Sequence, residues 1–283
     1  MANTSAFRSL LLPAGLVALL YATALILVFQ YSVREVIPGS LEPGGFTLDN
    51  YASLGHPLYL SVFLRTLGMC AATAVIVLLI GYPLAYYMVR ARSRFLRSLI
   101  LLICIMPLFL GDVPRSYAWI LMLGANGAVN GALKWVGLID RPVQMLFTVG
   151  GVVVALVHIT LPFMTLLLAV GISHIDQLYE KAARSLGANP LRVFLTVTLP
   201  LSVPAILAGF MTVFALNFSA YATPIMVGGG KVNMISNVVY QLGIASFNYP
   251  FAATLSLISL VAVLAVVGLV GRASRKIGQR YAE

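Results

Sequence analysis

The feature that most constrains this chain is a set of long apolar segments without Asp, Glu, Lys or Arg. Residues 9–33, 66–89 and 250–271 are all free of these charges. A helix needs about 20 apolar residues to cross a bilayer, and each segment is long enough. Because the bilayer core offers no partners to exposed backbone groups, such segments are stable there as helices. The sequence therefore predicts three transmembrane helices at these positions.

Three further spans follow from weaker signals. Residues 143–173 and 198–226 supply a fourth and a fifth apolar stretch. The last one, 98–119, is interrupted by Asp112 and Arg115, and it can span only if these side chains face protein or water. The expected fold class is therefore an all-α integral membrane protein with six transmembrane helices.

Composition agrees with this fold class. Of all residues, 60% are hydrophobic and only 9% are charged, and the mean hydropathy is +0.98. A soluble domain does not have such a composition. Because no hydrophilic linker is longer than the loop at 34–58, we expect residues 1–283 to form a single domain.

The first apolar segment could instead be a secretory signal. Arg8 precedes it, and Ala22-Thr-Ala24 resembles a cleavage site. The apolar run nevertheless continues to Val33, whereas the hydrophobic region of a signal peptide covers about 7–15 residues. We therefore interpret it as a transmembrane helix.

The distribution of basic residues predicts the orientation. If the N-terminus is inside, 12 of the 18 Lys and Arg residues lie in cytoplasmic segments. These are Arg8, Arg90, Arg92, Arg94, Arg97, Lys181, Arg184, Arg192, Arg272, Arg275, Lys276 and Arg280. Basic residues favour the cytoplasmic side. Both termini and the loop at 174–197 are thus expected in the cytoplasm of a multi-pass protein of the bacterial inner membrane, and the net charge of +10 also favours contact with anionic lipid.

A polar segment at residues 174–197 stands between two apolar runs. Leu178, Ala182 and Leu186 repeat at the spacing of one helical face, and Glu180 and Arg184 are spaced for an i, i+4 ion pair. The pattern predicts that Gly187 ends this helix, with Asn189 as the N-cap and Pro190 as the first residue of a second helix. A helical hairpin at the membrane surface is expected.

This segment resembles the "EAA" loop of permease subunits from ATP-binding-cassette importers. That loop has a Glu-Ala-Ala triplet, a following Gly and an apolar stretch ending in Leu-Pro; here Lys181 interrupts the triplet. The resemblance implies the type I importer fold and a coupling helix that docks on a separate ATPase subunit. The residues that it places at this contact are Glu180, Ala182, Ala183, Arg184, Gly187, Asn189 and Pro190. The alternative interpretation is an ordinary amphipathic connector.

Other motifs are similar to those of spermidine/putrescine-type permeases, in particular the first of their two permease types. They are Phe46-Thr-Leu-Asp-Asn-Tyr51, Gly81-Tyr-Pro-Leu-Ala85, Asp140-Arg-Pro142, Tyr221-Ala-Thr-Pro224 and Asn248-Tyr-Pro250. The resemblance implies uptake of a polyamine or a related small amine. Asp112 and Pro114 depart from the polyamine pattern, which leaves open amino-acid derivatives, opines, phosphonates and iron.

The same resemblance implies an assembly. Its parts are two ATP-binding-cassette ATPase subunits that carry ATP and Mg, a second permease that is homologous and expected to differ, and a periplasmic or lipid-anchored solute-binding protein. This chain is expected to bind no cofactor of its own. The run Gly228-Gly-Gly230-Lys231-Val232 lacks the earlier Gly and the following Ser or Thr of a phosphate-binding loop, so the sequence predicts no nucleotide site and no enzymatic activity.

Candidate pathway residues are few. Asp112 can face a cationic solute or pair with Arg115, three residues on. His158, within an apolar segment, can mark the pathway or form a hydrogen bond between helices. Tyr86, Trp119 and Tyr221 are expected to supply aromatic surfaces for a cation.

Other classes of protein fit less well. A secondary transporter driven by an ion gradient typically needs more ionisable residues near the midplane. A membrane enzyme would need clustered carboxylates, a metal-binding set or an activated nucleophile, and the sequence has no such cluster and no catalytic or metal-ligand pattern. Nucleic-acid binding is not expected because the basic residues are dispersed among apolar spans.

Overall fold

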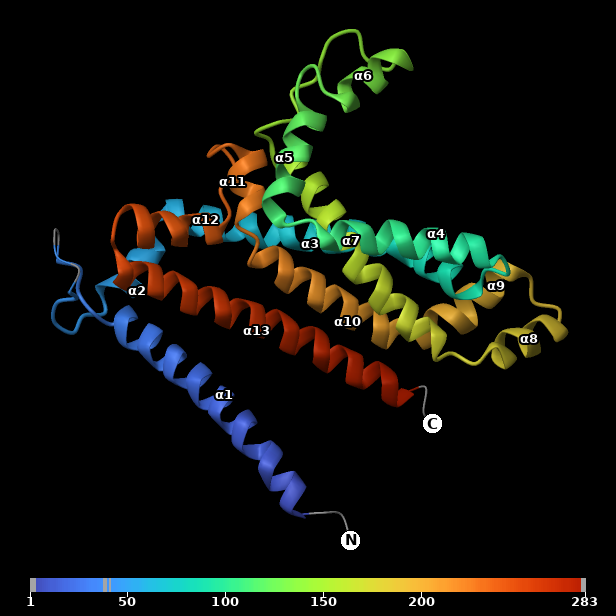
Figure 1. Ribbon diagram of the computed structural model, residues 1–283, viewed down its shortest axis with the longest axis horizontal. Coiled ribbons are helices and arrows are strands. Elements are labelled where there is room, and N and C mark those ends of the chain that lie inside the picture. Colours follow the sequence, from blue (N-terminus) through green and yellow to red (C-terminus); the bar gives the residue numbers. More distant parts are fainter. Residues whose placement is uncertain (1–3, 38–39, 41, 281–283) are drawn as a thin grey trace. The chain divides into compact units, whose positions relative to one another are not determined.

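A computed structural model describes residues 4–37, 40 and 42–280, and most of these residues are helical (Figure 1). The first half contains α1 (Thr4–Ser32), α2 (Asp49–Ala52), the 3-10 helix η1 (Ser53–Gly55), α3 (Pro57–Arg90), α4 (Arg94–Ile105), the 3-10 helix η2 (Met106–Phe109), α5 (Asp112–Leu123) and α6 (Ala128–Trp135). The second half contains α7 (Val149–Ser173), α8 (Gln177–Ser185), α9 (Pro190–Val193), the π-helix η3 (Phe194–Thr198), α10 (Leu199–Phe218), α11 (Ala222–Gly228), α12 (Ile235–Tyr240), the π-helix η4 (Gln241–Ala245) and α13 (Tyr249–Arg280).

Five helical segments in the described part of the chain are long and apolar enough to cross a membrane. They are Pro13–Ser32, Pro57–Arg90, Val149–Ser173, Pro190–Phe218 and Tyr249–Arg272. A sixth span results if the bent pair Arg94–Phe109 and Asp112–Trp135 is counted as one. The all-α membrane fold expected from the sequence is thus confirmed.

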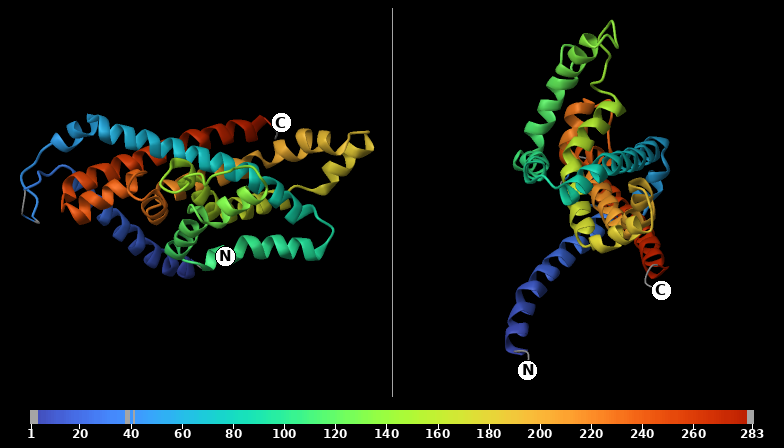
Figure 2. Two further views of the ribbon diagram at one scale, coloured as in Figure 1. Left: turned by 90° about the horizontal axis from the view of Figure 1, so that it is seen from above. Right: turned by 90° about the vertical axis from the view of Figure 1, so that its right-hand side faces the viewer.

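The third expected span, 98–119, differs from a straight helix. The pair of helices is bent by 108° at a break around Leu110 and Gly111, where α5 leaves the direction of α4 (Figures 1 and 2). Both residues have extended backbone, and Pro107 lies in the short 3-10 helix that ends there. Pro114 falls in the first turn of α5, where its missing N–H is not needed. The break turns Arg115 into the protein.

The chain divides into two compact units, residues 4–61 with 238–261 and residues 62–237 with 262–280. In the first unit, the buried Asn50 side chain donates from Nδ2 to the carbonyls of Ser32 (3.0 Å) and Arg34 (2.8 Å). Thr254 Oγ1 also donates to Ser32 O, at 3.0 Å. These bonds satisfy backbone groups at the end of α1, so the motif at 46–51 has a structural role there.

The core of the second unit lies among α3, α7 and α10. Its buried residues include Val77, Met164, Leu168 and Val213. Small residues allow the close approach: a Cβ on Gly81 would lie 3.2 Å from Met164 Cγ, and one on Gly209 would lie 2.6 Å from Met164 Sδ. Helices in membranes commonly pack through such small residues. This core supports both sites described below.

Candidate functional site

The polar segment after α7 folds as the expected helical hairpin. Helix α8 ends at Ser185, and Gly187 follows with φ +85°, a left-handed conformation that favours glycine. Its N–H donates to Arg184 O at 2.9 Å, and Ala188 N donates to Ala183 O at 3.1 Å, which satisfies the last carbonyls of the helix. The predicted start of the second helix is also confirmed.

At that start, Asn189 Oδ1 accepts from Arg192 N at 2.7 Å, and Pro190 is the first residue of α9. We refer to residues 174–197 as the coupling loop.

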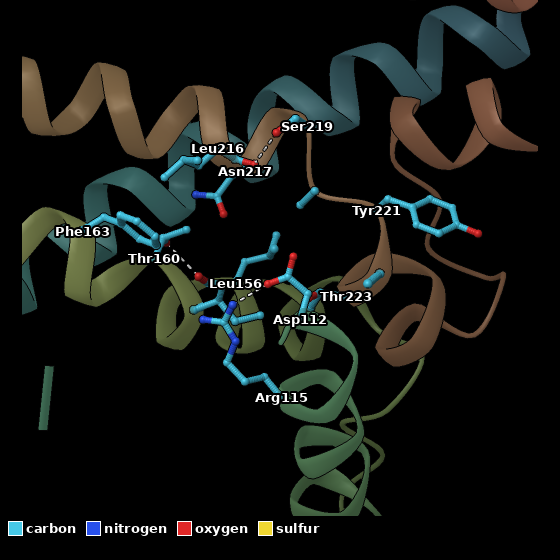
Figure 3. Close-up of a pocket in the computed structure, with 13 residues that line it drawn as sticks. Asp112, Arg115, Leu156, Thr160, Phe163, Leu216, Asn217, Ser219, Tyr221 and Thr223 are labelled. Atoms are coloured by element: carbon cyan, nitrogen blue, oxygen red, sulfur yellow. Dashed lines mark hydrogen bonds and ion pairs between the residues drawn. The ribbon is translucent and has the colours of Figure 1, made fainter. Parts of the chain in front are cut away.

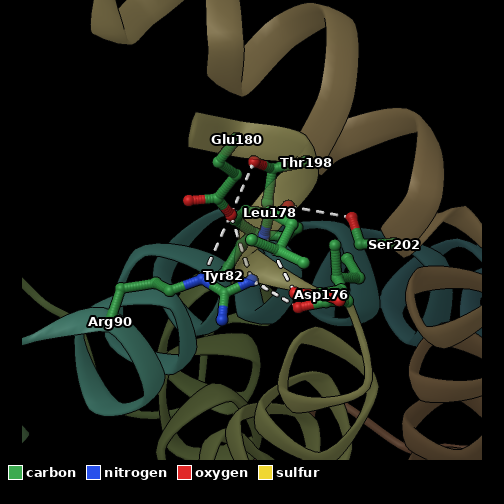
Figure 4. Close-up of polar contacts among 8 residues, drawn as sticks. Tyr82, Arg90, Asp176, Leu178, Glu180, Thr198 and Ser202 are labelled. Carbon is green, nitrogen blue, oxygen red and sulfur yellow. Dashed lines mark hydrogen bonds and ion pairs between the residues drawn. The ribbon is translucent and has the colours of Figure 1, made fainter. Parts of the chain in front are cut away.

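Glu180 pairs with a different partner from the one predicted. The i, i+4 pair with Arg184 is wrong, because Glu180 is buried and Oε1 binds Arg90, at 3.1 Å from Nε and 3.0 Å from Nη2 (Figure 4). Thr198 Oγ1 donates to the same oxygen at 3.2 Å, and Arg90 Nη2 also donates to Ile175 O at 2.9 Å. Glu180 faces the end of α3, whereas the Arg184 side faces solvent. The pair therefore ties α8 to α3 and to the π-helix η3.

The opposite face of the hairpin is exposed and apolar. Leu178, Tyr179, Leu186 and Leu191 are between 61% and 89% exposed, Ala182 and Arg184 are exposed, and Ala183 is partly so. Exposed apolar patches of this kind mark sites of contact with another molecule. The coupling loop is thus held on one side by a buried ion pair and offers an apolar surface on the other.

A second candidate site is a cavity of about 340 Å³ among α5, α7, α10 and α11 (Figure 3). Its lining residues include Asp112, Arg115, Thr160, Asn217, Tyr221 and Thr223, and we call it the Asn217 pocket. Asp112 accepts a hydrogen bond from Arg115 Nη2 as part of an ion pair. Of the two alternatives for Asp112, the structure contains the ion pair and also places the side chain at the pocket, where 66% of it is exposed.

Buried polar atoms concentrate at this pocket. Arg115 is 8% exposed, and its Nε and Nη1 have no hydrogen-bond partner in the described protein. Asn217 is fully buried, and neither atom of its amide has a partner there. By contrast, the Thr223 and Ser116 hydroxyls pair with each other at 2.9 Å, and Thr160 donates to Leu156 O. Unpartnered buried groups are uncommon in native proteins and point to a ligand or water.

The remaining predicted pathway residues lie elsewhere or point away. His158 Nδ1 accepts from Trp119 Nε1 at 3.2 Å, which fits the interpretation of His158 as a histidine hydrogen-bonded between helices. Tyr86 packs edge-on against Phe194, with ring centroids 6.0 Å apart, next to the coupling loop. Tyr221 lines the pocket, but its ring points away from Asn217 (Figure 3).

Sequence reasoning missed Arg90 and Asn217 as site residues. Arg90 looked like one of several basic residues that set the topology. Asn217 could have been found, because it is a lone amide in the apolar run from 199 to 218.

The helices and the hairpin define a multi-pass α-helical membrane protein with a helical hairpin whose outer face is exposed and apolar. Residues 77–280 match the sequence model of the family described as "Binding-protein-dependent transport system inner membrane component", and the chain belongs to this family. It is a permease subunit of an ATP-binding-cassette importer with the type I fold and resides in the inner membrane.

Two permeases are similar to this chain over most or all of its length. The spermidine/putrescine transport system permease protein PotB of Salmonella typhimurium (strain SL1344) is 30% identical over 285 residues, covering 100% of this chain and 99% of that protein. PotB of Escherichia coli (strain K12) is 35% identical over 235 residues, covering 83% and 85%.

Among solved structures, a bacterial ABC transporter that imports the acidic polysaccharide alginate matches with a TM-score of 0.76 and 20% identity, covering 96% of this chain and 95% of that one. The inward-facing MetNI methionine ABC transporter matches with a TM-score of 0.58 and 17% identity, covering 80% and 98%. At these identities the structures show a shared fold alone.

Proposed function

We propose that this chain forms half of the translocation pathway of an importer for a polyamine or a related small amine. The similarity to the PotB proteins, which extends over nearly the whole chain, supports this solute class. Asp112, which lines the Asn217 pocket and whose side chain is 66% exposed, supplies the carboxylate that an ammonium group requires in a low-dielectric pathway. A second permease, expected to be homologous but different, completes the pathway.

The coupling loop carries the proposal of an ATP-driven mechanism. Its apolar face, with Leu178, Tyr179, Leu186 and Leu191, is suited to a cleft on a cytoplasmic ATPase subunit. In the assembly that we propose, two such subunits bind ATP and Mg, and this chain has no nucleotide site. Closure of the ATPases moves the loop, and the Arg90–Glu180 pair transmits the movement to α3.

The proposed orientation places both termini and the coupling loop in the cytoplasm. The arginine bias supports it, since Arg90, Arg97 and Arg192 all lie near the coupling-loop end of their helices. A solute-binding protein, free in the periplasm or anchored by lipid, then delivers solute on the other face.

Substitutions in the coupling loop test the mechanism. In the importer assembled with its partners, Gly187→Asp strains a left-handed backbone position, and Ala183→Trp adds bulk at the proposed interface. We expect both variants to insert normally but to lose transport, with the ATPase detached or its hydrolysis insensitive to loaded binding protein.

A matched control is Gly137→Asp, which strains a second left-handed glycine, at φ +77°, after α6. It should retain stimulated hydrolysis. Normal solute-stimulated hydrolysis in both coupling-loop variants would refute the proposed role.

A further inference from the structure

We propose that the Asn217 pocket binds a carboxylate of the transported amine, so that the solute is a small zwitterion rather than a polyamine without a carboxylate. This inference rests on the proposed function, import of a small amine, and narrows its solute class. Two independent features carry it: the charges that line the pocket, and the buried polar atoms that have no partner within the described part of the chain.

The charges of the pocket cancel. Among the described residues that line it, Asp112 and Arg115 carry the fixed charges, one negative and one positive. A polyamine brings several positive charges into a low-dielectric space and needs an excess of carboxylates to compensate them. A zwitterion brings both signs and no net charge. The lining therefore matches a zwitterion better than a polycation.

Arg115 has donors to spare. Its Nη2 binds Asp112, while Nε and Nη1 are buried and have no hydrogen-bond partner among the described residues. A guanidinium group carries five N–H donors and accepts no hydrogen bonds, so its unused nitrogens require an acceptor. A carboxylate is the acceptor that arginine binds most strongly. An ammonium group cannot serve, because it too is only a donor and is repelled by the same charge.

Asn217 supplies a second donor to the same space. Its amide is fully buried, neither its nitrogen nor its oxygen has a partner in the described protein, and Figure 3 shows the side chain in the same space as Asp112 and Arg115. The hydroxyls of Thr160 and Thr223 already have partners. Leaving a buried amide unpaired is costly, and pairing with a ligand removes that cost. The geometry thus places a carboxylate between Arg115 and Asn217 and an ammonium group at the exposed Asp112.

Two probes of equal length test this assignment. Putrescine and 4-aminobutanoate share a four-carbon chain, and one ammonium of the first is replaced by a carboxylate in the second. Equilibrium dialysis of each radiolabelled probe against the complete importer in nanodiscs, without binding protein, measures the affinity of the transmembrane site. We expect 4-aminobutanoate to bind at least about tenfold more tightly, because charge-assisted hydrogen bonds to Arg115 contribute this much.

Substitutions in the pocket separate the effect of its charges on ligand affinity from the effect of side-chain packing. Arg115→Gln should weaken binding of 4-aminobutanoate by about 10- to 100-fold and strengthen binding of putrescine, because the pocket then has a net negative charge. Asn217→Leu removes the amide at similar size and should weaken 4-aminobutanoate by about tenfold. Lys231→Gln removes an exposed cation that lies outside the pocket, near Phe147, and should change neither affinity.

Several results would overturn the inference: tighter binding of putrescine to the parental importer, binding of neither probe, or an unchanged preference in the Arg115 and Asn217 variants. If Arg115→Gln fails to assemble, the affinities of the Asn217→Leu variant for the two probes test the inference by themselves. If the inference about the zwitterion fails, uptake of the two amines by cells shows whether the proposed function fails with it. Cells that import putrescine through this transporter retain the function without the zwitterion site, whereas cells that import neither of these amines nor spermidine refute the amine importer itself.

Discussion

Replacing Glu180 with glutamine should leave a buried cation without its counter-ion. Oε1 of Glu180 accepts from Arg90 Nε (3.1 Å), Arg90 Nη2 (3.0 Å) and Thr198 Oγ1 (3.2 Å), and the two charged side chains are only 10% and 7% exposed. Breaking such a buried pair by removing one partner costs about 3–5 kcal/mol. We expect Glu180→Gln to lower the free energy of unfolding of the purified importer in detergent by about this amount.

The loss of unfolding free energy caused by substituting Glu180 should depend on whether Arg90 is present. Replacing both partners with apolar residues, Arg90→Met with Glu180→Leu, removes the unpaired charge, so the double variant should be more stable than either single variant. Arg184→Gln is the matched control, because Arg184 is exposed and is not the partner of Glu180; its effect should stay within about 0.5 kcal/mol. Denaturant titration of the parental chain, the two single variants Arg90→Met and Glu180→Leu, and the double variant gives the coupling energy between Arg90 and Glu180.

Glu180→Gln should also weaken the coupling between solute delivery and ATP hydrolysis. Because the ion pair connects α8 to α3, Glu180→Gln is expected to preserve basal ATP hydrolysis but reduce its stimulation by loaded binding protein. Additive effects of the Arg90 and Glu180 substitutions, or a Glu180→Gln variant as stable as the Arg184→Gln control, would show that the pair does not hold the coupling loop.

Three further predictions concern other parts of the chain. Topology reporters fused after Arg97, Arg192 and Arg280 should read cytoplasmic and those at Gly44 and Val232 periplasmic; an external Arg192 would refute the orientation. Gly229→Val should destabilise the loop after α11, measured as faster proteolysis of that loop, because Gly229 has φ +54° and a side chain there would meet the Phe147 ring; wild-type cleavage kinetics would contradict this. Asp112→Asn should slow amine uptake while assembly and basal hydrolysis persist, since Arg115 then gives the pocket a net positive charge; uptake at the parental rate would remove Asp112 from the pathway.

The sequence was sufficient for the local structure of the coupling loop. Gly187, Asn189 and Pro190 specify a helix end, a cap and a helix start through interactions within a few residues, and such signals are visible in a single sequence. The partner of Glu180 was mispredicted for the opposite reason. Arg90 is 90 residues away, and the choice between it and the nearby Arg184 depends on which face of α8 packs against α3.

The break between α4 and α5 shows a similar limit. Asp112 and Arg115 indicate that residues 98–119 are not an ordinary span and can cross the membrane only if these two charges face protein or water. The sequence did not reveal a bend of 108°, because the direction of α5 depends on the extended backbone of Leu110 and Gly111 and on where Arg115 becomes buried. Asn217 was overlooked although it is a lone amide in an apolar run. The sequence could mark it as unusual, but that its amide is buried without a partner among the described residues depends on the packing of α5, α7 and α10.

The central claim, an ATP-driven amine importer in which this permease is moved through its coupling loop, is tested most directly by uptake into proteoliposomes. The complete importer is reconstituted with ATP and Mg on the cytoplasmic face, loaded binding protein on the other face, and no ion gradient. We expect labelled amine to accumulate with the parental chain and not with Gly187→Asp, and a protonophore to have no effect. Accumulation that needs an ion gradient rather than ATP, or that survives in Gly187→Asp, would contradict the account.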